Sequence, residues 1–125
     1  MGNAGIDIWP PNSVSKYVDR AFPFNESFWV YKASLYAILN IEILTAYDLY
    51  SSSAQVSVNI QNIGIIEPRP MSRYQDPQPY SIMFSTGLFT PPAPYTGKQR
   101  LTIRAMSQND WLIVGKWWVQ YNSGA

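Results

Sequence analysis

Hydrophobic and polar positions alternate with a period of two along residues 28–50. The odd positions from 29 to 43 are all apolar or aromatic: Trp29, Tyr31, Ala33, Leu35, Ala37, Leu39, Ile41 and Ile43. The even positions include the polar side chains of Lys32, Asn40 and Glu42. Such alternation places every second side chain on one face of a β-strand, whereas a helix over 33–43 would lack a capping residue. We therefore predict strand structure with one continuous core face.

A second alternation runs from Ala54 to Gln61, with small or apolar residues at the even positions. The phase then changes, because the next apolar residues are Ile63 and Ile65. One extra residue in a β-bulge produces such a change, and Gly64 permits the accompanying twist. We predict a strand through residue 61 that is followed by a bulge.

Proline divides the middle of the chain into loops. Residues 67–80 contain four prolines, and residues 87–97 contain the run Pro91-Pro92-Ala93-Pro94. Proline lacks a backbone N–H and is excluded from helix interiors and central strands. We predict loops over 67–80 and 87–97, with a short strand at 80–84 between them.

The last third of the chain alternates in two segments, 100–105 and 111–121, around the turn-forming run 107–110. We predict a hairpin whose second strand is partly apolar on both faces. With a weaker strand at 16–24, the chain has roughly six to eight strands and no convincing helix. The prediction is one all-β domain over 1–125, an antiparallel β-sandwich of jelly-roll type with an extended N-terminal arm at 1–15. The pattern alone leaves an immunoglobulin-like strand order open.

Composition excludes several classes of function. The chain has no histidine and no cysteine, which excludes disulfides, thiol nucleophiles, imidazole catalysis and the usual zinc sites. Its eight acidic residues show no spacing that selects a catalytic pair. The net charge of +1 does not indicate nucleic-acid binding, and no apolar run is long enough to span a membrane. We expect a protein without enzymatic activity, metal or cofactor.

The surface composition favours assembly with other subunits. Charged residues make up 14% of the chain, against about 25% in typical soluble domains, and aromatic residues reach 15%. Interface centres are depleted of charge and enriched in aromatic side chains. The expected contact residues are uncharged positions of the second alternating segment, part of the first proline-rich loop and one C-terminal aromatic: Gln55, Ser57, Asn59, Gln61, Arg69, Arg73, Tyr74 and Trp118. The partners would be copies of this chain or other structural proteins.

The aromatic residues of the final segment permit a second interpretation. Trp111, Trp118 and Tyr121 could form a platform on which sugar rings stack, with polar neighbours supplying hydrogen bonds. Such a platform is typical of a carbohydrate-binding module, which would be extracellular. Trp117 is instead expected in the core. Both interpretations require an exposed tryptophan.

Three segments resemble a family of structural proteins. Residues Phe28–Ile43 are similar to an early core strand of the single jelly-roll capsid proteins of small icosahedral viruses, and Val114–Tyr121 are similar to their final strand. Pro94-Tyr95-Thr96 also resembles a loop of that family. The resemblance implies a jelly roll of about eight strands that builds a shell in the virion through contacts between capsid subunits. Residues 1–15 contain no lysine or arginine, unlike many genome-binding arms, so our main expectation includes minor capsid and cement proteins.

Overall fold

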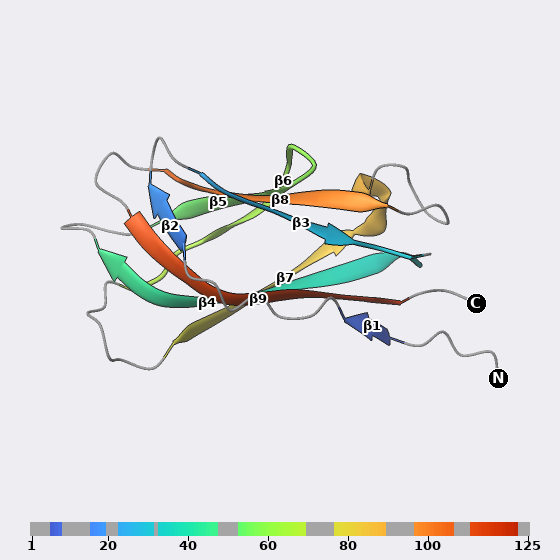
Figure 1. Cartoon of the computed structure of the whole chain (residues 1–125), viewed down its shortest axis with the longest axis horizontal. Coiled ribbons are helices and arrows are strands. Elements are labelled where there is room, and N and C mark those ends of the chain that lie inside the picture. The colour runs from blue at the N-terminus through green and yellow to red at the C-terminus, as the bar shows by residue number, and fades with distance from the viewer. Residues whose placement is uncertain are drawn as a thin grey trace.

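The computed structural model describes residues 6–8, 16–19, 23–31, 33–47, 53–69, 77–89, 97–106 and 111–122. In these residues two antiparallel β-sheets pack face to face (Figure 1). The β9 sheet contains β1 (Ile6–Ile8), β2 (Lys16–Asp19), β4 (Tyr36–Tyr47), β7 (Gln78–Ser85) and β9 (Trp111–Asn122). The β8 sheet contains β3 (Phe24–Trp29), β5 (Ala54–Val58), β6 (Gln61–Ile66) and β8 (Lys98–Ala105). In the described ranges the only helical element is the 3-10 turn η1 (Thr86–Leu88).

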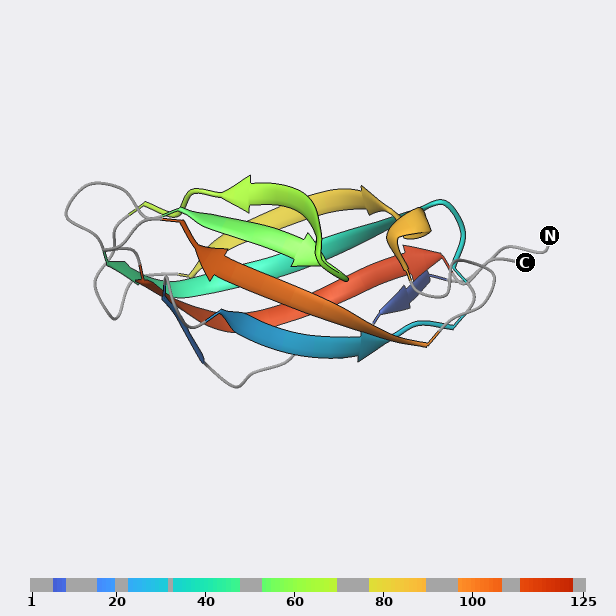
Figure 2. The same cartoon turned by 90° about the horizontal axis from the view of Figure 1, so that it is seen from above.

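The strand pairing is nested. β2 pairs with β9, β3 with β8, β4 with β7 and β5 with β6, so the chain forms a long antiparallel ribbon that folds over on itself. Hydrogen-bonded pairing of β4 with β9 joins two of these pairs into one sheet, and pairing of β5 with β8 joins the other two into the second sheet. Figure 2 shows the strands of the β8 sheet lying across those of the β9 sheet. This is the jelly-roll arrangement, so the predicted fold class is confirmed.

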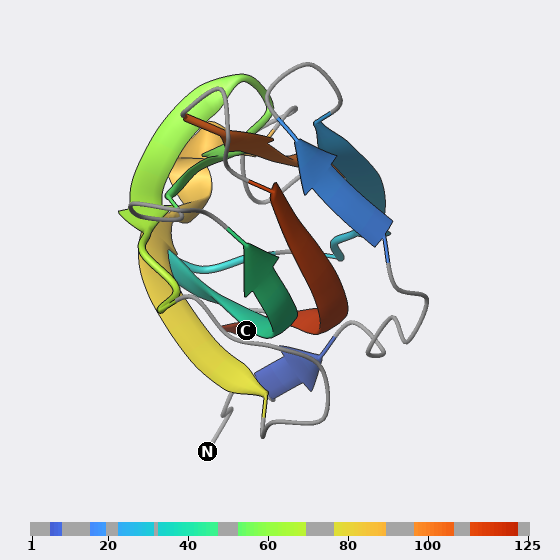
Figure 3. The same cartoon turned by 90° about the vertical axis from the view of Figure 1, so that its left-hand side faces the viewer.

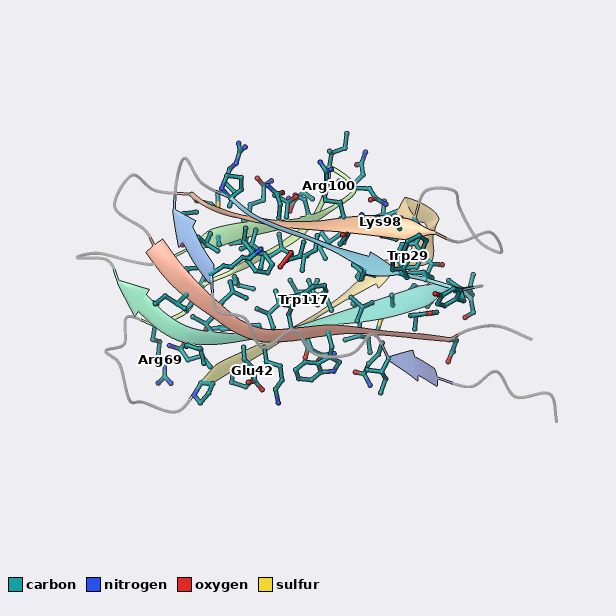
Figure 4. The ribbon with its side chains drawn as sticks, viewed as in Figure 1. Trp29, Glu42, Arg69, Lys98, Arg100 and Trp117 are labelled. Atoms are coloured by element: carbon teal, nitrogen blue, oxygen red, sulfur yellow. The ribbon has the colours of Figure 1, made fainter. Side chains whose placement is uncertain are left out.

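Aromatic side chains hold the two sheets together. Trp117 of β9 is 1% exposed and packs edge-to-face against Phe24 and Phe28 of β3, with ring centroids 6.4 and 6.2 Å apart. The ring contacts continue from Phe28 to Phe89 and from Phe89 to Phe84 of β7. Figure 4 shows Trp117 in the space between the sheets. The expected place of Trp117 in the core is confirmed, and this cluster forms the centre of the sandwich.

Residues 30–35 carry the chain from one sheet to the other. The prediction of one continuous core face over residues 28–50 is therefore wrong, because two strands of different sheets make up the segment. Trp29 and Leu35, which that prediction placed in the core, are 44% and 72% exposed. The predicted alternation holds within β4, where the odd positions from 37 to 43 are buried.

β4 and β9 contain matching irregularities in their common ladder. The register shifts between Ile41 and Ile43 and again between Ile43 and Thr45. Gly115 of β9 lies at the first shift, and Leu44 of β4 lies at the second. A Cβ atom on Gly115 would lie only 2.6 Å from Cγ of Leu44. The Leu44 side chain therefore packs against position 115 only because glycine has no side chain.

β5 and β6 form a tight hairpin through the two-residue turn Asn59–Ile60. Both turn residues have positive φ, 50° for Asn59 and 67° for Ile60, as in the I′ turns that match the twist of a hairpin. The predicted strand through residue 61 is wrong, because the turn reverses the chain after Val58. The predicted bulge is present in β6, where the register with β5 shifts next to Gly64.

The last two strands do not form the predicted hairpin. β8 pairs with β3 and β5, whereas β9 pairs with β1, β2 and β4 in the opposite sheet. The side-chain phase of β9 also changes at Gly115. Odd-numbered residues are therefore buried from Trp117 to Tyr121, whereas the even-numbered Leu112 and Val114 are buried before the change.

The proline-rich segments and the N-terminal segment are described in part. β7 begins at Gln78, inside the first predicted loop, and includes Pro79, which is tolerated because β7 is at the edge of its sheet. Residues 70–76 and 90–96 lie outside the described residues. Within the predicted arm at 1–15, Ile6–Ile8 pairs with β9. Among the described residues no helix is long and apolar enough to cross a membrane.

β2 lies at one open edge of the sandwich, beside β3 (Figure 3). Nζ of Lys16 lies 2.9 Å from Oε1 of Glu26 and 5.8 Å from the ring centre of Phe24. The ion pair is partly exposed, so it contributes little to stability. Its effect is to hold the Glu26 carboxylate at the edge of β3.

Candidate functional site

The outer face of the β8 sheet is positively charged. Alternate residues of β8 are buried, so the remaining ones point to solvent: Lys98, Arg100, Thr102 and Arg104. The neighbouring strands add outward residues that carry no charge: Asn25, Ser27 and Trp29 of β3, and Gln55 and Ser57 of β5. We term this set of residues the basic face. Figure 4 shows Trp29, Lys98 and Arg100 along it, on the side away from Trp117.

A depression of about 710 Å³ lies on the basic face. Its lining comes from β3, from β8 and from the β5–β6 turn: Asn25, Glu26, Ser27, Asn59, Ile60, Lys98, Gln99 and Arg100. Ser27 pairs directly with Arg100 across the β3–β8 ladder, and the turn projects beyond the sheet (Figure 1). Three segments that are distant in sequence therefore form one open site whose lining combines polar and apolar surface.

Asn59 fixes the turn beside the depression. Its Nδ2 donates hydrogen bonds to the backbone oxygen of Leu88 at 2.9 Å and to Oε1 of Gln99 at 2.6 Å. Its Oδ1 accepts from the backbone N–H of Arg100 at 2.9 Å. Both amide hydrogens are thus used inside the protein, so Asn59 positions the wall of the depression and is not a ligand donor.

Ile60 occupies the second position of the turn in a strained conformation. Its φ of 67° lies in the left-handed region, which β-branched residues rarely adopt and in which glycine is favoured. Its side chain is 86% exposed, so burial does not offset the strain. Strained residues of this kind cluster at ligand-binding sites. The exposed apolar side chain of Ile60 is therefore a candidate ligand contact.

The cations of the depression have no acidic partner among the described residues. Glu26, which lines the depression, is paired with Lys16, and no described acidic side chain forms an ion pair with Lys98 or Arg100. Oγ1 of Thr102 donates to Oδ1 of Asn25 at 2.8 Å, which orients the Asn25 amide on the β3 side. The floor consequently offers cationic donors, an amide and the hydroxyl of Ser27.

Trp29 lies next to this floor, directly across the ladder from Lys98. It is 44% exposed. An exposed indole beside hydroxyl and amide groups can stack on the C–H face of a sugar ring while its polar neighbours bind the ring hydroxyls. The alternation in the sequence does not indicate Trp29 as a site residue, because it places the odd positions of the segment in the core. The adjacent buried Phe28 shows that β3 has the opposite phase.

The residues predicted at a subunit interface are not on one surface. Gln55 and Ser57 lie on the basic face, opposite Arg104 and Thr102 of β8, so the uncharged surface expected there is in fact lined by cations of the next strand. Asn59 belongs to the turn rather than to that strand face.

The other predicted interface residues lie elsewhere. Gln61 is exposed at the start of β6. Arg69 lies near the β9 sheet (Figure 4), and the side chain of Gln78 bonds to its backbone N–H and carbonyl at 2.9 and 2.7 Å. Arg73 and Tyr74 lie outside the described residues.

The predicted aromatic platform is not formed as expected. Tyr121 is 4% exposed, and its hydroxyl accepts a hydrogen bond from the backbone N–H of Tyr31 at 3.0 Å, so it belongs to the interior. Trp118 lies half-buried on the outer face of the β9 sheet, with Nζ of Lys116 6.0 Å from its ring centre. The side chain of Trp111 is outside the described residues. Tyr121 and Trp118 therefore do not share a surface.

A polar ladder crosses the β9 sheet beside Trp118. Oγ of Ser81 donates to Oδ1 of Asn40 at 2.7 Å, and Nδ2 of Asn40 donates to Oε1 of Gln120 at 3.0 Å. Asn40 pairs directly with Trp118 in the β4–β9 register. These amides bind one another, which makes this outer face a weaker candidate for ligand binding than the basic face.

One perturbed ionisable group lies away from the basic face, at Tyr80 of β7. Burial raises the pKa of its hydroxyl, an effect opposed by the nearby Arg69 and reinforced by Glu67. The hydroxyl donates to Oε1 of Gln78 at 2.9 Å. Within the described part of the chain, no cluster of acidic side chains is suited to holding a metal ion.

Comparisons with known proteins identify the fold. No protein-family model matches the sequence, and a search of curated proteins finds no significant match. A family 35 carbohydrate-binding module from an environmental isolate has a TM-score of 0.60 and 11% identity, covering 99% of this chain and 95% of that chain. The CBM36-1 domain of a multidomain xylanase from the hindgut metagenome of Trinervitermes trinervoides has a TM-score of 0.54 and 9% identity, covering 92% and 96%. The shared fold is thus a jelly-roll β-sandwich.

These comparisons correct the main functional expectation. The carbohydrate-binding modules match over nearly their whole length, which contradicts the expected capsid or capsid-associated role. The expected location of the protein stays a prediction. The resemblance of Phe28–Ile43 to capsid proteins reflects the core of the jelly-roll fold, which hosts many functions. The predicted self-association stays a prediction.

Proposed function

We propose that this chain is a carbohydrate-binding domain that holds a glycan against the basic face. The observation that carries the proposal is the depression beside the Asn59–Ile60 turn, because its hydrogen-bonding floor includes Lys98, the ladder partner of the exposed Trp29. Sugars present hydroxyls that donate and accept together with apolar C–H faces, and this site has partners for both. The likeness to carbohydrate-binding modules supports the same conclusion at the level of the fold.

Binding without hydrolysis is the activity that these side chains support. Glycosidases use two carboxyl groups held about 5–10 Å apart across the bond that breaks. The lining of the depression includes one carboxylate, Glu26, and its Oε1 is 2.9 Å from the ammonium of Lys16. One carboxylate among the described lining residues cannot supply both the acid and the nucleophile or base of that mechanism.

The basic face is preferred over the Trp118 surface for a physical reason. Lys116 already lies over the ring of Trp118, and the neighbouring amides of Asn40 and Gln120 bind each other. A sugar would have to displace these contacts. Trp29 is more exposed, and the floor beside it keeps cationic donors without acidic partners in the described residues.

A titration with soluble polysaccharides tests the proposal. The protein is titrated with xylan, galactomannan, hydroxyethyl cellulose, carboxymethyl cellulose and polygalacturonate, and binding is followed by calorimetry. We expect saturable binding to at least one of them. Trp29→Ala should weaken it about tenfold or more, the loss expected of a central aromatic contact.

Trp118→Ala is the matched control, because it removes the same side chain from the opposite outer face. It should leave the affinity unchanged within about twofold. The proposal fails if no polysaccharide binds. The placement of the site fails if Trp118→Ala abolishes binding and Trp29→Ala does not. Because Trp29 is exposed on an edge strand, unfolding curves of both variants should confirm that the fold is intact.

A further inference from the structure

We infer that the glycan recognised by the basic face is anionic, a polysaccharide that carries carboxylate or sulfate groups. This inference rests on the proposed function and adds the chemical class of the ligand. Three cations, Lys98, Arg100 and Arg104, point outward from a single strand. All residues of β3, β5 and β8 are described, and their outward positions carry no acidic side chain.

The cations form a linear array. Alternate residues of a strand lie about 7 Å apart on one face, so Lys98 and Arg100 are neighbours and Arg104 lies two steps further along. Thr102 occupies the position between the two arginines, with its hydroxyl bonded to Asn25. An extended polymer with repeated negative groups can meet all three cations at once, whereas a small anion would contact only one or two.

Among the described strands, the excess of positive charge lies on the outer face of the β8 sheet. On the outer face of the β9 sheet the described charged side chains of β4 and β9 include one of each sign, Glu42 and Lys116. Figure 4 shows Glu42 on that side and Lys98 and Arg100 on the other. The carboxylate nearest the cations, Glu26, is paired with Lys16. The chain has a net charge of only +1, so the positive potential comes from this arrangement rather than from composition.

The groups between the cations favour a polysaccharide over a nucleic acid. The outward neighbours of Arg100 and Arg104 are hydroxyls and amides from Ser27, Ser57 and Gln55. These groups match the hydroxyls of sugar rings. Single-stranded nucleic acids are held by successive aromatic platforms, and the outward positions of β3, β5 and β8 provide one aromatic residue, Trp29.

The experiment compares polymers that share a backbone and differ in charge. Calorimetric titrations use carboxymethyl cellulose against hydroxyethyl cellulose, and dextran sulfate against dextran, with a single-stranded oligothymidylate as the nucleic-acid probe. The variants are Lys98→Gln, Arg100→Gln and Arg104→Gln, which keep a polar side chain and remove the charge. Lys116→Gln is the matched control on the opposite face.

We expect a charged polymer to bind at least about tenfold more tightly than its neutral counterpart, since charge-assisted hydrogen bonds are lost with the neutral chain. Arg100→Gln, at the centre of the depression, should weaken binding about tenfold, and the triple variant should abolish the preference. Lys116→Gln should change nothing. Affinity should also fall as salt is raised from about 0.1 M to 1 M, because the screening length shrinks from about 10 Å to 3 Å.

Four results would overturn the inference. If the charged and the neutral polymer of each pair bind equally, and Trp29→Ala still lowers the affinity, the protein binds glycans without a preference for charge. The inference that the ligand is anionic would then be wrong, whereas the proposed function would stand. If none of the polymers binds, both this inference and the proposed function are wrong. Tighter binding to the oligothymidylate than to any polysaccharide, or equal losses in Lys116→Gln and Arg100→Gln, would show nucleic-acid recognition or diffuse attraction instead.

Discussion

Ile60→Gly should stabilise the protein and weaken ligand binding at the same time. Holding an L-residue in the left-handed region costs about 1–2 kcal/mol, and glycine removes this cost. The greater conformational freedom of glycine stabilises the unfolded chain and lowers the free energy of unfolding by about 0.4–1 kcal/mol. The side chain is 86% exposed, so its removal loses little burial. The free energy of unfolding should therefore rise by about 0.5–1 kcal/mol.

Urea unfolding followed by tryptophan fluorescence measures this change, and Ile65→Gly is the matched control. Ile65 is 50% exposed, and it lies inside β6 rather than in the turn. Glycine at that position gains nothing from relief of strain and should cost about 0.5–1 kcal/mol. The two substitutions are thus expected to have opposite signs.

Binding supplies the second half of the prediction. Ile60 lines the depression, so its loss should lower polysaccharide affinity severalfold even though the fold is more stable. The reasoning from strain is refuted if Ile60→Gly destabilises the protein as much as Ile65→Gly does. If stability rises and affinity is unchanged, Ile60 is not a ligand contact.

Three further predictions concern the fold. Gly115→Ala should lower the unfolding free energy by about 1–3 kcal/mol, because the new Cβ would lie 2.6 Å from Cγ of Leu44, and adding Leu44→Ala should recover most of the loss in a double-mutant cycle. Trp117→Ala should cost about 3–5 kcal/mol in urea unfolding, and a loss below about 1 kcal/mol would contradict its place at the centre of the core. Because burial raises the pKa of Tyr80 in the folded state, the unfolded chain loses that proton first as the pH rises above about 10, so stability should fall with increasing pH there. Tyr80→Phe should flatten this dependence, and an unchanged slope would contradict it.

The sequence pattern predicts strands well where one sheet face is buried along the whole segment. The alternations in β4, β5 and β8 are examples, since their inward residues are apolar with few exceptions. The pattern fails where a strand changes sheet or contains a bulge. Trp29 was assigned to the core because the break at residues 30–35 has no proline or glycine to mark it. The phase change at Gly115 depends on Leu44, a contact between distant segments that no local rule contains.

The candidate site illustrates the same limit. Its alternating cations are visible in the sequence, because Arg100 and Arg104 fall on one face of a strand in any register. The depression is not visible, since it needs the strand order that places β3 and the β5–β6 turn beside β8. The turn itself was missed because Ile60 stands where glycine is the usual signal. A residue that violates a local preference is therefore informative only after the structure shows what it faces.

The nested pairing of strands determines when this chain can fold during its synthesis. Val18 of β2 pairs with Leu112 of β9, and β4 also needs β9 as a partner, so the central ladder of the β9 sheet cannot form before β9 is synthesised. Until then β4 presents an unpaired edge with apolar side chains, the kind of segment that associates with other chains. Closure over such sequence distances is slow. The nascent chain should accordingly depend on chaperones until residues 111–122 emerge.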